Sequence, residues 1–359
     1  MLTRAQQNAL ACVKQCAATR RDNDVRRINA VLSAAHVEIA PDDLIKGVKK
    51  SARLTTNFHP DRLIADGRSV IAALHEDGIY RSQFETKISN GGLTAYPGGD
   101  RDRWEARMLG GAYQAAGVTD AERPKYGGLN LMNYTDGACP RFGSCHLRLK
   151  QRIVSHATLT FGDSNSDPTD IGVIGAFEPV LAGLLERIAA DSNALGRKEI
   201  TVSDFVHALL DDGRGFLHPA RGRALDDYIE AQLHGELSLA HEVEAIVGDP
   251  SFRGTATGEL MEATAKKYGI PLEWHAGFAL TLPEIPADFR GPEMLPLAQR
   301  ILKKHASDSE YVDAATIGLA AFSVVVNPQE WADWGNPKDT LQHIKYLWHT
   351  LVVFGRPKQ

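Results

Sequence analysis

Two stretches of the sequence concentrate side chains that could carry out chemistry. In the first, HPDR, an imidazole (His59), a carboxylate (Asp61) and a guanidinium (Arg62) lie within four positions. In the second, YIEAQLHG, the carboxylate of Glu230 lies in a segment with strand character. A carboxylate next to a bound substrate can stabilise positive charge that develops in the transition state. The two stretches would form one site only if the fold brings them together.

A third segment, YRSQFETKISNGG at residues 80–92, is richer in hydrogen-bonding groups than a connecting loop needs. Hydroxyl and amide groups could bind the ribose or the amide of a nucleotide, and Gly91-Gly92 would allow close approach to the backbone. The same residue types also satisfy the local backbone in turns, so the segment by itself permits both interpretations. Its candidate ligand-binding residues are Tyr80, Ser82, Gln83, Thr86 and Ser89.

Two local structures compete for the segment that carries Glu230. On a strand, alternate side chains share a face, so the polar residues from Tyr228 to His234 would point the same way. The competing structure is a helix over RALDDYIEAQL with its acidic side chains in solvent, and local propensity permits either. After the strand, a helix is expected from about Ser238, with apolar residues at Leu239, Val243 and Ile246.

His59 and Asp61 also suggest a metal site, at spacing i, i+2. Catalytic zinc needs about three protein ligands, and the sequence marks no further ones. It contains no HExxH motif, and its four cysteines show no paired metal spacing. No bound metal is expected, and metal-dependent hydrolysis through His59 and Asp61 stays an alternative.

The composition is that of an ordinary globular protein. The 359 residues are 43% hydrophobic and 24% charged, and the net charge of −5 argues against a dedicated nucleic-acid-binding protein. Residues 1–21 lack the apolar core of a signal peptide, and no apolar run approaches the roughly 20 residues of a membrane span. The sequence therefore predicts a cytoplasmic protein, or one delivered from the cytoplasm by a signal not visible in it, with no membrane partner.

The elements that must position these residues divide the chain into three parts. Residues 1–52 have helical periodicity and are expected to form three helices, the first behind a capping box at Thr3 and Gln6. Residues 53–290 form the core, with helices expected at 67–76, from 100, at 169–190 and at 201–212. Residues 291–359 are again helical. The core strands are expected at 53–58, 126–132, 142–150, 155–164, 227–235 and 271–282. Because they cluster instead of alternating regularly with helices, the pattern predicts an α+β fold and argues against a Rossmann fold or a barrel.

The order of the motifs resembles the ADP-ribosyltransferase superfamily: a strand ending in His, a turn with Tyr and Ser (DGIYRSQF), and much later a strand-borne Glu. More narrowly, FHPDR, YRSQFETKISNGG, RPKYGGLNL, FGSCHLRLK, TFGDS and EAQLHG resemble the bacterial domain-of-unknown-function family 3626, over about residues 53–283. The superfamily resemblance implies an α+β core with a split β-sheet, between helical N- and C-terminal segments.

The superfamily resemblance also implies roles for single residues. His59, or alternatively Arg62, would hold the ribose or phosphate of NAD. Tyr80 or Ser82 would contact the nicotinamide end. Glu230 would bond a ribose hydroxyl and stabilise the positive sugar as the nicotinamide–ribose bond breaks. The implied catalytic residues are Glu230, His59 and Tyr80, and the implied NAD-binding residues are His59, Arg62, Tyr80, Ser82, Gln83, Thr86, Ser89 and Gln232.

The implied function is NAD-dependent ADP-ribosyl transfer, with NAD as co-substrate and a macromolecule as acceptor. A protein acceptor is expected rather than a nucleic acid, as for a bacterial toxin or effector. Two alternatives remain: a catalytically silent module that binds a nucleotide or ADP-ribose, and the metal-dependent hydrolase described above.

Overall fold

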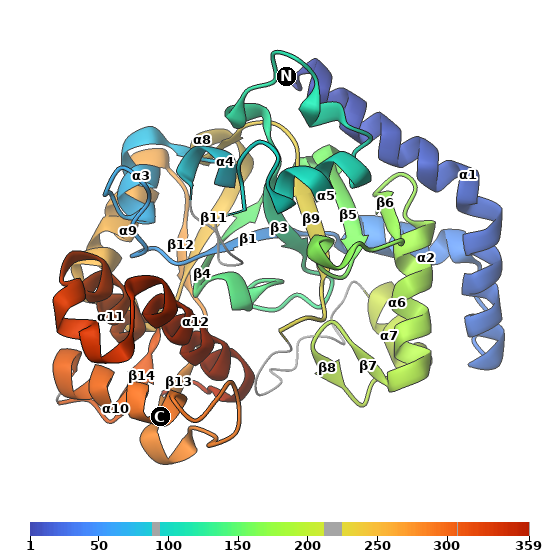
Figure 1. Ribbon diagram of the computed structural model, residues 1–359. Coiled ribbons are helices and arrows are strands. Elements are labelled where there is room, and N and C mark those ends of the chain that lie inside the picture. Colours follow the sequence, from blue (N-terminus) through green and yellow to red (C-terminus); the bar gives the residue numbers. More distant parts are fainter. Residues whose placement is uncertain (88–93, 212–224, 307, 359) are drawn as a thin grey trace.

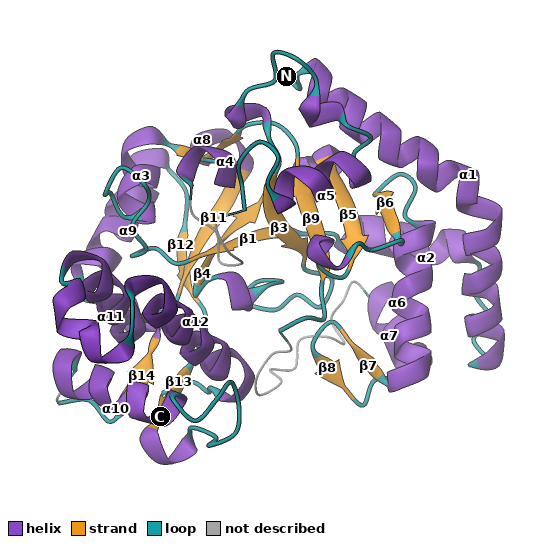
Figure 2. Cartoon of the chain, viewed as in Figure 1, coloured by secondary structure: helices purple, strands orange, loops and turns teal. Residues whose placement is uncertain are grey.

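The computed structural model describes residues 1–87, 94–211, 225–306 and 308–358. A central sheet separates two groups of helices, one from the N-terminal and middle parts of the chain and one mainly from its C-terminal part (Figures 1 and 2). The protein is therefore a mixed α+β protein, as the clustering of strand candidates predicts.

The central sheet has eight strands and is mostly antiparallel; only β11 and β12 are paired in parallel. Its strands in spatial order are β12 (Leu272–Trp274), β11 (Val243–Gly248), β4 (Cys145–Leu149), β1 (Leu54–Phe58), β3 (Lys125–Leu129), β9 (Ile229–Leu233), β5 (Ala157–Phe161) and β6 (Ile171–Val173). Three two-stranded ladders accompany it: β2 (Ile79–Tyr80) with β10 (Leu237–Ser238), β7 (Asn193–Ala194) with β8 (Arg197–Lys198), and β13 (Ala279–Thr281) with β14 (Tyr311–Asp313).

Two groups of helices flank the sheet (Figure 1). The N-terminal and middle group lies beside β5 and β6 and consists of α1 (Arg4–Ala34), α2 (Pro41–Ser51), α6 (Glu178–Asp191) and α7 (Val202–Leu210). The C-terminal group is α10 (Met294–His305), α11 (Ala314–Val326) and α12 (Pro337–Phe354). The remaining α-helices are α3 (Val70–Asp77), α4 (Gln83–Thr86), α5 (Asp100–Met108), α8 (Leu239–Glu242) and α9 (Ala256–Tyr268). None of the helices in the described part of the chain is long and apolar enough to cross a membrane.

The N-terminal part contains one long helix where two were expected. The capping box of Thr3 and Gln6 is confirmed at its start, but α1 continues through the polar stretch at 19–24. Asp24 is fully buried there and accepts one hydrogen bond each from Arg20 and Arg27, and Arg27 also binds Asp170. These ion pairs stabilise a polar turn of α1 at which hydrophobic periodicity alone predicts a break between two helices.

The helix expected from Ser238 is wrong beyond its first turn. The four-residue α8 is followed by β11, in which Val243, Ile246 and Val247 are buried between β4 and β12. β-branched residues suit such a two-sided strand, and burial in the sheet overrides the helical spacing.

Two other boundaries also differ from the expectations. The helix expected at 169–190 begins only at Glu178, after β6. The strand expected at 271–282 is two short strands, β12 and β13. Residues 229–233 form the strand β9, so the helix over RALDDYIEAQL is wrong and the strand that carries Glu230 is confirmed.

Candidate functional site

A cavity of about 770 Å³ opens where β1 and β3 separate. The two strands form only two residue pairs, the last at Thr55 and Gly128, whereas β1 and β4 form four. Beyond this point residues 57–59 at the end of β1 and residues 125–127 of β3 both line the cavity. The eight strands thus form one sheet in which β1 and β3 separate over part of their length, and the cavity lies in this split.

β9 presents Glu230 to this cavity. The carboxylate is oriented from both sides: Gln232 Nε2 donates to Oε1 (2.8 Å), and the backbone N–H of Ser164 donates to Oε2 (3.4 Å). Glu230 is only 5% exposed, and burial raises the pKa of its carboxyl to about 7, with a further contribution from the charge of Asp163. A carboxyl group near half-protonation at neutral pH can either accept or donate a proton.

Aromatic rings and one guanidinium form the wall beside Glu230. The Arg101 Cζ lies 4.8 Å from the ring centroid of Trp104 and 4.3 Å from that of Tyr126, and all three residues line the cavity. The charge of Arg101 also opposes the rise in the pKa of Glu230. The wall therefore offers ring faces together with one cation close to the carboxylate.

A buried charge network holds this wall in place. Tyr126 Oη donates to Glu105 Oε1 (2.8 Å), while Arg123 donates to Glu105 Oε2 (2.8 Å) and to Asp102 Oδ1 (2.5 Å). Burial raises the pKa of Glu105 to about 7. Because removing one partner would leave buried charge uncompensated, the network fixes α5 against the start of β3.

Sequence reasoning missed this wall, although α5 contains a signal for it. Arg101, Trp104, Glu105 and Met108 share one helical face, and all four are buried. Charged residues on the same face as buried apolar ones predict either a polar network or a ligand-facing surface. This pattern in DRDRWEARM would have placed α5 at the site.

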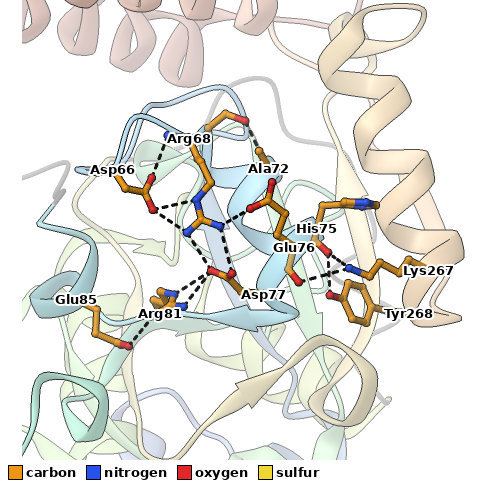
Figure 3. Close-up of polar contacts among 11 residues, drawn as sticks. Asp66, Arg68, Ala72, His75, Glu76, Asp77, Arg81, Glu85, Lys267 and Tyr268 are labelled. Atoms are coloured by element: carbon orange, nitrogen blue, oxygen red, sulfur yellow. Dashed lines mark hydrogen bonds and ion pairs between the residues drawn. The ribbon is translucent and has the colours of Figure 1, made fainter.

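A second wall comes from the turn that carries Tyr80, which lines the cavity with its ring edge-on to Phe58 (6.3 Å between centroids). β2 holds the turn by pairing with β10. Figure 3 shows the polar contacts that fix α3 beside it, with Arg68 pointing into a group of carboxylates. Arg68 donates to Asp66, Glu76 and Asp77, and Arg81 donates to Asp77 and Glu85.

The hydroxyl and amide residues after Tyr80 differ in what they do. Gln83 and Thr86 line the cavity, and the buried Gln83 Oε1 has no hydrogen-bond partner in the described structure. Ser82 is fully buried, caps α4 and donates to the carbonyl oxygen of Asp120 (2.7 Å), and it is not among the lining residues. Ser89 lies outside the described residues.

The far end of the cavity is built by the HPDR motif and α12. The His59 ring packs edge-on against Trp348 of α12 (5.2 Å between centroids), and burial lowers the pKa of His59 well below its usual value, so the ring is neutral. Arg62 lines the same end, where its buried Nε has no hydrogen-bond partner among the described residues. Arg62 thus offers unused donors, while His59 packs the core against α12.

The split brings most of the sequence-predicted residues to one cavity, but to different ends of it. The lining includes His59, Arg62, Tyr80, Gln83, Thr86 and Glu230. Gly128 of β3 pairs with Glu230 on one side and with Thr55 on the other. Glu230 is therefore in register with Thr55, which lies four residues before His59. Gln232 does not line the cavity and acts on it by orienting Glu230.

Within the part of the chain that the structure describes, His59 and Asp61 gain no further metal ligands. No group of three or more His, Cys, Asp or Glu side chains in the described ranges could hold a metal ion. Asp61 instead packs against α11, with its Oδ2 only 1.4 Å from where a Cβ on Gly318 would lie, and burial raises its pKa to about 6. The metal-hydrolase alternative therefore has no ligand set in this part of the chain.

These features define a class: an α+β protein with a polar, aromatic-walled cavity in the split of a mostly antiparallel sheet. By sequence the chain belongs to the family of proteins of unknown function DUF3626, whose model matches residues 53–354. The family resemblance of the motifs is thereby confirmed, and the match extends beyond the expected 53–283 through α12, so it includes every cavity wall. The comparison with curated proteins gave no match.

Proposed function

We propose that the protein is an NAD-dependent enzyme of the ADP-ribosyltransferase type, with an ADP-ribosyltransferase-like core. The observation that carries the proposal is Glu230, a buried carboxylate oriented by Gln232 in a cavity that also holds Tyr80 and Arg62. The position of this cavity in a split of the sheet fits the split core that the superfamily resemblance implies. Its volume of about 770 Å³ falls in the range of small-molecule sites.

In the proposed reaction the bond between the ribose C1′ and the nicotinamide nitrogen breaks, and its electron pair leaves with nicotinamide. A nucleophilic atom of the acceptor then bonds to C1′ and loses its proton. Glu230 would accept a hydrogen bond from a ribose hydroxyl and stabilise the positive charge on the sugar. The unpartnered Oε1 of Gln83 could accept a hydrogen bond from the nicotinamide amide, and Tyr80 offers a ring for it to contact.

The first experiment measures nicotinamide release from NAD by the purified protein, with and without cell lysate. Replacing Glu230 by Gln keeps the size and the contact with Gln232 but removes the charge. We expect E230Q to slow release about 100- to 1,000-fold, the effect of removing one such electrostatic group. Glu244→Gln is the matched control, because Glu244 is an exposed strand-borne glutamate outside the lining of this cavity.

Each outcome of this experiment bears on the proposal. Release that needs Glu230 but not Glu244 supports it, and stimulation by lysate supports a macromolecular acceptor. Protease or nuclease treatment of the lysate then separates a protein acceptor from a nucleic acid. Equal release by wild type and E230Q, or none by either while both remain folded, contradicts enzymatic ADP-ribosyl transfer through Glu230.

One observation favours a second candidate, a silent module that binds NAD or ADP-ribose. With a pKa of about 7, roughly half of the Glu230 side chains are neutral at pH 7, and a neutral carboxyl stabilises a positive sugar poorly. The enzyme should therefore release nicotinamide faster as pH rises through about 7. The silent module should bind NAD in calorimetry and release none between pH 6 and pH 9.

A further inference from the structure

Three cationic side chains from separate parts of the chain line the cavity at the end formed by α12. Arg62 follows β1 in the HPDR motif, Arg141 lies in the short 3₁₀ helix Pro140–Phe142, and Lys345 lies on α12. We refer to these three residues as the basic cluster. Glu230 and Asp163 form the acidic part of the lining, so one cavity holds side chains of opposite charge.

The donors of the basic cluster are only partly used within the protein. The Nε atoms of both Arg62 and Arg141 are buried without a hydrogen-bond partner in the described ranges. Arg141 pairs through Nη1 with the exposed Asp226 and the carbonyl oxygen of Leu225. A buried donor without a partner destabilises the protein, so a ligand oxygen that accepts a hydrogen bond from these atoms would be favoured.

The cations also act on one another. Burial lowers the pKa of Lys345, and the charges of Arg141, Arg290 and Arg62 lower it further. The neighbouring His349 responds in the same way: burial, Arg141 and Arg290 lower its pKa to about 3. Burial lowers the pKa of Arg62, and the charge of Asp61, which packs against Gly318 of α11, opposes this. Cationic side chains that lie close together in a partly buried site repel one another, and a bound anion would offset this repulsion.

We propose that the basic cluster is the diphosphate subsite of the cavity, so that α12 is part of the nucleotide-binding site. The inference rests on the proposed function, since it takes the ligand to be a dinucleotide. Two guanidinium groups can each bind phosphate oxygens bidentately, and an ammonium adds a point charge. Repulsion by Glu230 and Asp163 keeps a diphosphate away from the acidic part, which leaves that part for the uncharged hydroxyls of a ribose.

Isothermal titration calorimetry with inorganic pyrophosphate tests the subsite without any reaction. We expect wild type to bind pyrophosphate, and Lys345→Gln and Arg141→Gln each to weaken it about 10-fold or more, as hydrogen bonds to charged groups predict. Lys303→Gln is the matched control, because Lys303 is an exposed lysine of α10 outside the cavity lining. Thermal unfolding verifies that each variant is folded.

Two further arms identify what the subsite recognises. ADP should bind more tightly than adenosine, and the difference should disappear in the double variant Arg141→Gln/Lys345→Gln. The proposal is overturned if pyrophosphate does not bind to wild type, if the two variants bind it as Lys303→Gln does, or if adenosine binds as tightly as ADP.

This test separates the subsite from the chemistry. E230Q should bind pyrophosphate at least as tightly as wild type, because it removes an acidic charge and leaves all three cations of the basic cluster in place. If pyrophosphate binds through Arg141 and Lys345 while no variant releases nicotinamide, the subsite stands and the proposed reaction fails. If nicotinamide release depends on Glu230 while Arg141→Gln and Lys345→Gln do not weaken pyrophosphate binding, the proposed reaction is supported and the proposed subsite is wrong.

Discussion

The carboxyl group of Glu230 occupies a position where burial works against ionisation. Its hydrogen bonds to Gln232 and the backbone of Ser164 compensate only in part, since its pKa remains raised to about 7. The neutral form is favoured in the folded protein, whereas in the unfolded chain the group ionises near 4.5. The stability that the neutral form contributes is therefore fully present below about pH 4.5 and is lost as pH rises through about 7.

This linkage predicts that E230Q is more stable than wild type at alkaline pH. A glutamine stays neutral, so it does not bear the cost of a buried charge. We expect equal unfolding temperatures near pH 4.5 and a gain at pH 8 corresponding to about 1–3 kcal/mol in the free energy of unfolding. Thermal unfolding of both proteins at pH 5, 6, 7 and 8 measures this gain, with Glu244→Gln as the control. A difference that does not change with pH would contradict the raised pKa.

At the scale of elements, one close contact holds α11 against the core. Gly318 lies in α11 where any side chain would meet the Asp61 carboxylate of the HPDR motif. The motif thus has two structural contacts with the C-terminal helices, Asp61 with α11 and His59 with Trp348 of α12. Both contacts set the position of the wall that carries Lys345.

Gly318→Ala is expected to destabilise the protein. Within a helix this change usually adds about 1 kcal/mol of stability, but here the overpacking should cost about 1–3 kcal/mol. Denaturant unfolding measures the change. Gly175→Ala is the control, because a Cβ there meets nothing within 4 Å. Adding Asp61→Ala to Gly318→Ala should recover part of the loss, and a Gly318→Ala protein as stable as wild type would contradict the contact.

The elements that the sequence predicts well are those with a local signal. The capping box of Thr3 and Gln6 locates the start of α1, and alternation locates β9. β11 could not be predicted in this way, because Val243 and Ile246 have helical spacing and become a strand only when β4 and β12 bury them. The polar turn of α1 depends on Asp170, which lies far away in the sequence.

The residues of the candidate site also divide into those with a local sequence signal and those that only tertiary packing places. Glu230 and Tyr80 could be proposed because their segments carry recognisable motifs. Arg141, Lys345 and Arg101 could not, since each lies in a segment with no motif of its own and reaches the cavity only through tertiary packing. Whether a polar residue binds a ligand or caps a helix, as Ser82 does, is also decided by its neighbours in space.

At the scale of the whole molecule, charge is distributed unevenly around the cavity, and this predicts a response to ionic strength. Replacing Lys345 by Gln should raise the unfolding temperature at low salt, because it relieves repulsion from Arg62 and Arg141. The gain should shrink as salt screens the charges. Thermal unfolding at about 20 mM and 500 mM NaCl measures it, with Lys303→Gln as control. A Lys345→Gln protein that is less stable than wild type at low salt would contradict the repulsion.

The cavity in the split is assembled from segments spread over nearly the whole chain. His59 follows β1 near the start of the sequence, Glu230 lies on β9 in its second half, and Lys345 lies on α12 near its end. Domains fold during synthesis in the order in which the ribosome delivers their residues. A nascent chain that already carries Glu230 therefore still lacks the helix that closes the cavity. Translation must pass Lys345 before the carboxylate and the basic cluster can bind one ligand together.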